Sequence, residues 1–91
     1  MPMATTQIQE SPTLNRLRTI ITAVASIEPT DISATQSVWE DLQISAEITL
    51  PKIIKLVNEQ FGTALTKADI LDQVETVAEF VELIDNEVEL G

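Results

Sequence analysis

Apolar residues recur along this chain at spacings of three and four, the period of an α-helix that buries one face. The first stripe follows Ser11-Pro12, a favourable N-cap and a favourable first helical residue. Glu28-Pro29 is expected to stop this helix, because proline disfavours helical backbone at the residue before it. The pattern therefore predicts one long amphipathic helix. Its inward positions are Leu14, Leu17, Ile20, Ile21, Val24 and Ala25.

A second helix is predicted to reach Glu59 or Phe61, with Gly62 as the residue that ends it. A short third helix is expected from the cap Thr66 through about Gln73. The expected buried face of the second helix is Ile48, Leu50, Ile53, Ile54, Val57 and Phe61, and that of the third is Ile70 and Leu71.

Thr76-Val77-Ala78-Glu79 has the spacing of a capping box, with Thr at the N-cap and Glu three residues later. It predicts a fourth helix with Val77, Phe80, Val81 and Ile84 (or Leu83) facing inward. From Asp85 onward the chain is acidic and is expected to fray. The whole pattern predicts an all-α four-helix bundle of three longer helices and one short one.

Residues 28–46 form a long connection between the first two helices. The segment is rich in turn-forming and capping residues, yet it also contains Ile32, Val38, Trp39, Leu42 and Ile44. So many apolar side chains predict a loop pinned onto the core, with the single tryptophan as its anchor. Structureless loops of this length are uncommon in small domains unless they are functional.

The start of the second helix is limited by Pro51, because a proline beyond the first turn clashes with the carbonyl four residues back. If Thr49 were the N-cap, Pro51 would be the second helical residue. Two alternatives remain for Ser45. It caps a separate short turn that kinks at Pro51, or it belongs to the loop ahead of the helix.

The composition narrows the class of protein. The chain has 91 residues, enough for one domain, with 44% apolar and only 3% aromatic residues. Residues 11-86 are expected to form that domain, residues 1-10 a disordered arm and residues 87-91 an acidic tail. No signal peptide or membrane-spanning run is present, so the expectation is a cytoplasmic monomer.

The net charge of −10 makes nucleic acid and anionic membranes poor partners, because their phosphates would be repelled. There is no Cys and no His, which excludes disulfides, thiolate chemistry, Cys/His zinc sites and Ser-His catalysis. No carboxylate pair has a spacing that suggests acid–base catalysis, and the two glycines do not form a phosphate loop. We therefore expect a protein that is not an enzyme.

Several segments, in their order and spacing, resemble the acyl carrier protein family over roughly residues 12 to 85. The segment 37–42, Ser-Val-Trp-Glu-Asp-Leu, is similar to the one that precedes the modified serine of that family. The segment 53–62 is similar to the end of its second helix, which closes with Glu-x-Phe. Leu65-Thr66 is similar to the start of its third helix, and Glu75-Thr76-Val77 to the start of its last.

The resemblance implies an acyl-carrier-protein-like bundle and a function in holding acyl or peptidyl intermediates as thioesters. In that family a phosphopantetheinyl transferase attaches 4'-phosphopantetheine from coenzyme A to a serine at the start of the second helix. The corresponding candidate here is Ser45. The partners implied are this transferase and acyl-transfer or synthase enzymes of fatty-acid, polyketide or hybrid peptide biosynthesis.

This chain departs from the family at the attachment motif, where Ile44-Ser45-Ala46 replaces Asp-Ser-Leu. The stretch from Leu42 to Phe61 is also one residue longer than the usual pattern. Two alternatives follow. Ser45 is the attachment site in a variant motif, or the site is lost and the chain is an unmodified carrier-like interaction module, with Ser45 as a turn or capping residue.

The second helix also departs from the family in its charge. That helix is usually strongly acidic on its exposed side, whereas here it includes Lys52 and Lys55. Most acidic residues instead lie in the last third of the chain, where we expect a solvated face. If partners bind through charge, they are expected to differ from those of an ordinary fatty-acid carrier.

Overall fold

The computed structural model describes residues 11–90, so the arm expected for residues 1-10 lies outside the described range. The first helix, α2, comprises Pro12–Ala25. As predicted, Ser11 caps it, and its Oγ accepts a hydrogen bond from the Leu14 N–H at 3.1 Å. The buried positions of α2 all belong to the predicted stripe: Leu14, Leu17, Ile20 and Ile21.

The predicted end of this helix at Glu28-Pro29 is wrong, because α2 ends earlier. Ser26 adopts a left-handed conformation (φ 61°), and its N–H bonds to the Thr22 carbonyl at 3.0 Å. A left-handed cap satisfies a free carbonyl and turns the chain away, so the helix has ended before the proline is reached. The proline instead begins a 3-10 turn, η1, Pro29–Asp31.

The other three helices are α3, Thr49–Phe61, α4, Lys67–Gln73, and α5, Val77–Leu90. The predicted caps of α4 and α5 are confirmed. Thr66 and Asp69 form a reciprocal capping box, and the Thr76 Oγ1 accepts from the Glu79 N–H at 3.2 Å. Fraying from Asp85 was wrong, since α5 continues through Leu90.

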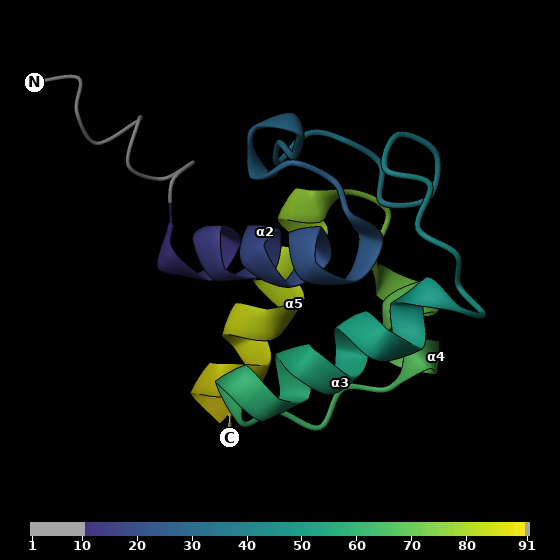
Figure 1. Cartoon of the computed structure of the whole chain (residues 1–91). Coiled ribbons are helices and arrows are strands. Elements are labelled where there is room, and N and C mark those ends of the chain that lie inside the picture. The colour runs from purple at the N-terminus through teal and green to yellow at the C-terminus, as the bar shows by residue number, and fades with distance from the viewer. Residues whose placement is uncertain (1–10, 91) are drawn as a thin grey trace, which may run out of the picture.

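Residues 11–90 thus form an all-helical four-helix bundle, as predicted. Helix α2 packs on α3 and α5, and the short α4 contacts both α3 and α5. Figure 1 shows the long connection between α2 and α3 crossing above α2 before it descends to the start of α3. None of the helices in this part of the chain combines the length and hydropathy that crossing a membrane requires.

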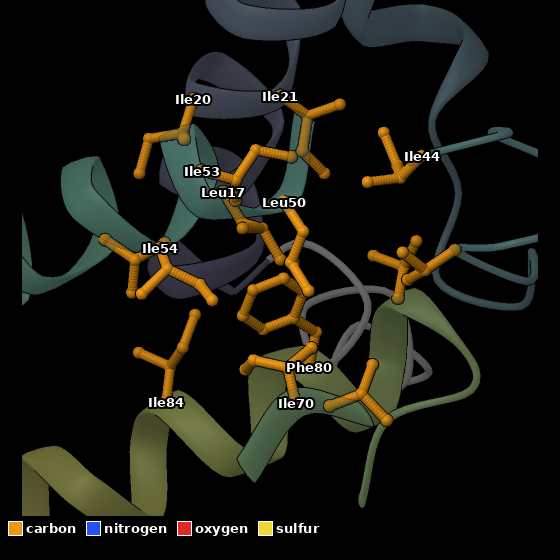
Figure 2. Close-up of a cluster of buried hydrophobic side chains, with 14 of the residues drawn as sticks. Leu17, Ile20, Ile21, Ile44, Leu50, Ile53, Ile54, Ile70, Phe80 and Ile84 are labelled. Carbon is orange, nitrogen blue, oxygen red and sulfur yellow. The ribbon is translucent and has the colours of Figure 1, made fainter. Parts of the chain in front are cut away.

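The four helices and the connection share one hydrophobic cluster. In Figure 2 the Phe80 ring points from α5 towards side chains of α2 and α3, including Leu17 and Leu50. Two inward predictions were wrong, because Ile48 is 68% exposed and Leu71 is 48% exposed. The connection contributes four buried side chains: Ile32, Val38, Leu42 and Ile44.

Candidate functional site

Ser45 is half-buried and lies where the connection meets the start of α3. Its Oγ accepts hydrogen bonds from the backbone N–H groups of Glu47, at 3.3 Å, and Ile48, at 3.2 Å. Its carbonyl accepts from the N–H groups of Thr49, at 3.1 Å, and Leu50, at 2.8 Å. Ser45 therefore caps the turn that opens α3 with both its side chain and its backbone.

This turn is wider than an α-helical turn, and Pro51 gives the physical reason. Pro51 is the third residue of α3; it has no N–H, and its ring would clash with a helically placed Glu47 carbonyl. The Leu50 N–H reaches back to the Ser45 carbonyl, which is the spacing of a π-type turn. Ser45 thus combines parts of the two alternatives: it lies in the loop ahead of α3 and caps the short turn of residues 46–48, which leads directly into the helix. Thr49 is the first helical residue and not the N-cap.

Gln43, two residues before Ser45, has a left-handed backbone with φ 56°. A residue with a Cβ is strained in this region, at a cost on the order of 1 kcal/mol. Such strain persists only where the surrounding contacts hold it, and here Leu42 and Ile44 on either side are both buried. Nothing in the sequence marks this conformation, because the residue is neither Gly nor Asn.

Ser37 and Asp41 close a second capped turn in the connection. The Ser37 Oγ accepts from the N–H groups of Trp39, at 3.2 Å, and Glu40, at 3.0 Å. In return, the Asp41 Oδ2 accepts from the Ser37 N–H at 2.8 Å. Of the Glu40-Asp41-Leu42 segment, Asp41 thus caps a turn and Leu42 packs in the core. The spacing of a serine followed by acidic residues three and four positions later is a signal from which this turn was predictable.

The connection is joined to the start of α5 by backbone hydrogen bonds. The Val38 N–H donates to the Glu75 carbonyl at 2.8 Å, and the Val77 N–H donates to the Gln36 carbonyl at 3.0 Å. These bonds surround a single antiparallel bridge between the two segments. The predicted pinning of the loop onto the core is confirmed, and Ser45 is held at the end of a tied segment.

Trp39 is the predicted anchor of this loop, and the structure confirms the contact. The ring is half-buried against the core, and its Nε1 donates to the Val74 carbonyl at 2.9 Å. Beside it, the Ser37 Oγ donates to the Glu75 carboxylate at 2.8 Å. The connection therefore depends on residues 74–77, far away in the sequence, for its position.

Glu79 stabilises residues 75 and 76, part of the segment against which the connection packs. Its Oε1 accepts from the N–H groups of Glu75, at 2.8 Å, and Thr76, at 3.0 Å. Hydrogen bonds to the ionised form lower the pKa of the Glu79 carboxyl below its ordinary value of 4.5, with the Thr76 N–H as the larger cause. The ionised Glu79 carboxylate therefore stabilises the turn before α5, to which the loop is hydrogen-bonded.

Substituting Glu79→Gln is expected to lower stability at neutral pH and to reduce the acid sensitivity of the fold. Because the folded-state pKa is lowered, the stabilisation is present above the unfolded-state value and is lost as the pH falls through the folded-state value. Urea unfolding of both proteins at several pH values between neutral and acid would test this. The two curves should converge in acid; a constant difference at every pH would contradict the charge as the cause.

Ile48 is the clearest difference from the predicted face of the second helix. The buried residues of α3 are Leu50, Ile53, Ile54 and Val57. A residue two positions before Leu50 points about 200° away on a helix, which places Ile48 on the opposite side. The side chain is accordingly exposed, next to the capped turn of Ser45.

Two cavities lie away from Ser45. One, of about 260 Å³, lies between the start of α2 and α5 and is lined by Leu14, Ala34, Ala78, Val81 and polar residues at its edge. The other, of about 470 Å³, lies beside η1 and is lined by polar residues of α2. Neither is lined by Ser45. No group of three acidic side chains in residues 11–90 lies close enough together to hold a metal ion.

Comparison of the sequence with models of known protein families found no match. A search of curated proteins found none either. The carrier-protein resemblance of the sequence therefore stays a prediction.

Proposed function

We propose that this protein is an acyl or peptidyl carrier that bears 4'-phosphopantetheine on Ser45. The observation that carries the proposal is the position of this serine. It ends a long connection that is tied down at several points, and its hydroxyl lies at the opening turn of the second major helix of a four-helix bundle. The intermediates would be thioesters on the thiol of the arm, which suits a chain without cysteine.

The residues around Ser45 fit a phosphodiester. The N–H groups of Glu47 and Ile48 point at the Oγ, and the start of α3 provides the positive end of a helix dipole. Loading would form an Oγ–P bond, break a pyrophosphate P–O bond of coenzyme A, release the nucleotide portion and pass the hydroxyl proton to the transferase. The chain needs to supply only the hydroxyl and the donors around it.

The strained Gln43 adds support. Strain of this kind concentrates at functional sites, where the surrounding structure holds a residue in an otherwise unfavourable conformation. Here it lies two residues from the proposed attachment point, between two buried neighbours. A purely structural loop would gain stability from glycine at this position.

The second candidate is an unmodified carrier-like interaction module. It is favoured by the same hydrogen bonds, because the Ser45 hydroxyl already caps the turn ahead of α3 and so has a structural role without any cofactor. The flanks Ile44 and Ala46 also depart from the family's attachment motif. In this case the exposed side of α3 would bind a partner directly.

Coexpression with a broad-specificity phosphopantetheinyl transferase, followed by intact-mass spectrometry, distinguishes the two. We expect the mass of one phosphopantetheine on the wild-type chain and on Thr49→Ala, the nearest other hydroxyl, but none on Ser45→Ala. Ser45→Ala loses the cap, which should lower its free energy of unfolding by about 1 kcal/mol. Circular dichroism must therefore show that this variant remains folded. No mass gain on wild type, or a gain that survives Ser45→Ala, would overturn the assignment.

A further inference from the structure

The cavity between the start of α2 and α5 combines an apolar wall with carboxylates at its edge. Leu14 and Val81 are among the residues of the wall, and Glu82 and Asp85 are the charged residues that line it. Its volume of about 260 Å³ is below the usual range of pockets for drug-sized ligands, so it suits one long side chain or a small molecule. Ser45 does not line this cavity, so a ligand bound there does not depend on the proposed function.

The charge that α5 brings to this cavity has one sign. The helix has five acidic residues and no Lys or Arg. Glu82 makes no hydrogen bond or ion pair with residues 11–90, and Asp85 accepts one hydrogen bond, from the Thr13 Oγ1. A ligand at this edge of the bundle therefore meets a carboxylate that the fold does not neutralise, and a cation is favoured there.

Both arginines of α2 have partners away from this edge. The Arg18 Nε donates to the Ile32 carbonyl at 2.9 Å, and its side chain lines the second cavity, beside η1. Arg16 donates to the Gln60 carbonyl at 3.0 Å and lies 4.5 Å from the Phe61 ring centre. The three lysines of the chain belong to α3 and α4. The edge of the α2–α5 cavity therefore stays negative when the cations of the bundle are taken into account.

The face of α5 that lines the cavity continues beyond it as a partly apolar surface. Val88 follows Val81 by about two helical turns and is 47% exposed. Glu89 follows Glu82 at the same spacing, so aliphatic and acidic side chains alternate along this face. A ligand small enough for the cavity alone cannot also cover Val88, whereas a protein surface can. The extent of this face therefore favours a protein over a free small molecule.

We propose that the cavity between α2 and α5 receives a lysine side chain of a partner protein, whose aliphatic neighbours cover Val88. The stem of a lysine packs on apolar surface while its ammonium group reaches a polar edge, which is the arrangement of wall and carboxylates found here. Nucleic acid and anionic membranes are disfavoured at this face, because the acidic residues of α5 would repel their phosphates. The inference goes beyond the proposed function and holds for a carrier and for an unmodified interaction module alike.

The test is a titration of the full chain with n-pentylammonium, a mimic of the lysine side chain, followed through backbone N–H signals by NMR. The signals of Ala34, Ala78 and Val81 are expected to shift, with a Kd about threefold lower than for n-pentanol, which has the stem without the charge. Glu82→Gln should remove this difference. Glu59→Gln, which changes an exposed carboxylate of α3 outside the cavity, should preserve it. Ala78→Leu should fill the cavity and weaken the binding of both compounds.

A capped Leu-Lys-Leu tripeptide separates a protein partner from a free amine. It is expected to bind more tightly than n-pentylammonium, and Val88→Ser should weaken the tripeptide but not the amine. Equal binding of n-pentanol and n-pentylammonium, or shifts only outside the cavity, would overturn the lysine site. Equal binding of tripeptide and amine, unchanged in Val88→Ser, would overturn the protein partner in favour of a small aliphatic amine. A dimer in sedimentation that Glu82→Gln dissociates would overturn it in favour of a lysine from a second copy of this chain.

Discussion

Phe80→Ala is expected to lower the free energy of unfolding by about 4 kcal/mol, a large part of the stability of a domain of this size. Phe80 is only 1% exposed, and its ring points from α5 into the cluster that α2 and α3 also form (Figure 2). Truncation removes the favourable free energy of burying the ring. It also leaves a cavity between α2, α3 and α5, which these packed helices cannot fully close. In a chain with 3% aromatic residues, no other ring can take its place.

Urea unfolding followed by circular dichroism measures this change, and Phe61→Ala provides the matched control. Phe61 is the same residue type but only half-buried, at the end of α3 beneath Arg16. Its loss should cost about 2 kcal/mol or less, because little cavity forms at a partly exposed site. Equal losses for both variants would contradict the placement of Phe80 at the centre of the core.

Trp39→Ala is expected to cost about 3 kcal/mol and to loosen the connection that leads to Ser45. The ring contributes buried apolar area, and its Nε1 provides one of the bonds that hold the loop against the segment before α5. Trp39→Phe keeps most of the packing and loses only this bond, so it should cost about 1 kcal/mol.

Hydrogen exchange adds a readout specific to the loop. In Trp39→Ala the N–H groups of Val38 and Val77, which bridge the loop and the start of α5, should exchange faster than N–H groups inside α2. If exchange instead rises equally in all helices, Trp39 stabilises the whole bundle and has no special part in positioning the loop. If neither stability nor exchange changes, the anchoring role is wrong.

The candidate site shows which features of a site residue patterns can predict and which they cannot. Ser45 was singled out from a family resemblance and from its place before a helix, and the structure shows it capping that helix start. The wide turn after Ser45 is explained by Pro51. A proline has no backbone N–H, so this effect could be predicted from the sequence. The left-handed Gln43 was not predictable, because buried neighbours rather than its own preference hold that conformation.

The helix caps were the most predictable features of the fold. Ser11, Thr66 and Thr76 each bond a backbone N–H within a few residues, so the whole interaction is present in the local sequence. The end of α2 was predicted too late along the chain. The helix ends at the left-handed cap Ser26, before Pro29 is reached. Leu71 was placed inward by its type, but Ile70 is the residue of α4 that is buried, and Leu71 is 48% exposed.

Local patterns thus determined the number of helices, most of their starts and most of the buried stripe, because caps, breakers and a 3.6-residue period all act over a few residues. The position of the connection was decided by long-range contacts instead. Trp39 meets Val74, and Ser37 meets Glu75, across separations that no periodicity encodes. Those contacts hold the loop that leads to Ser45 against the segment before α5, whereas the capped turn of Ser45 itself is formed by neighbours in the sequence.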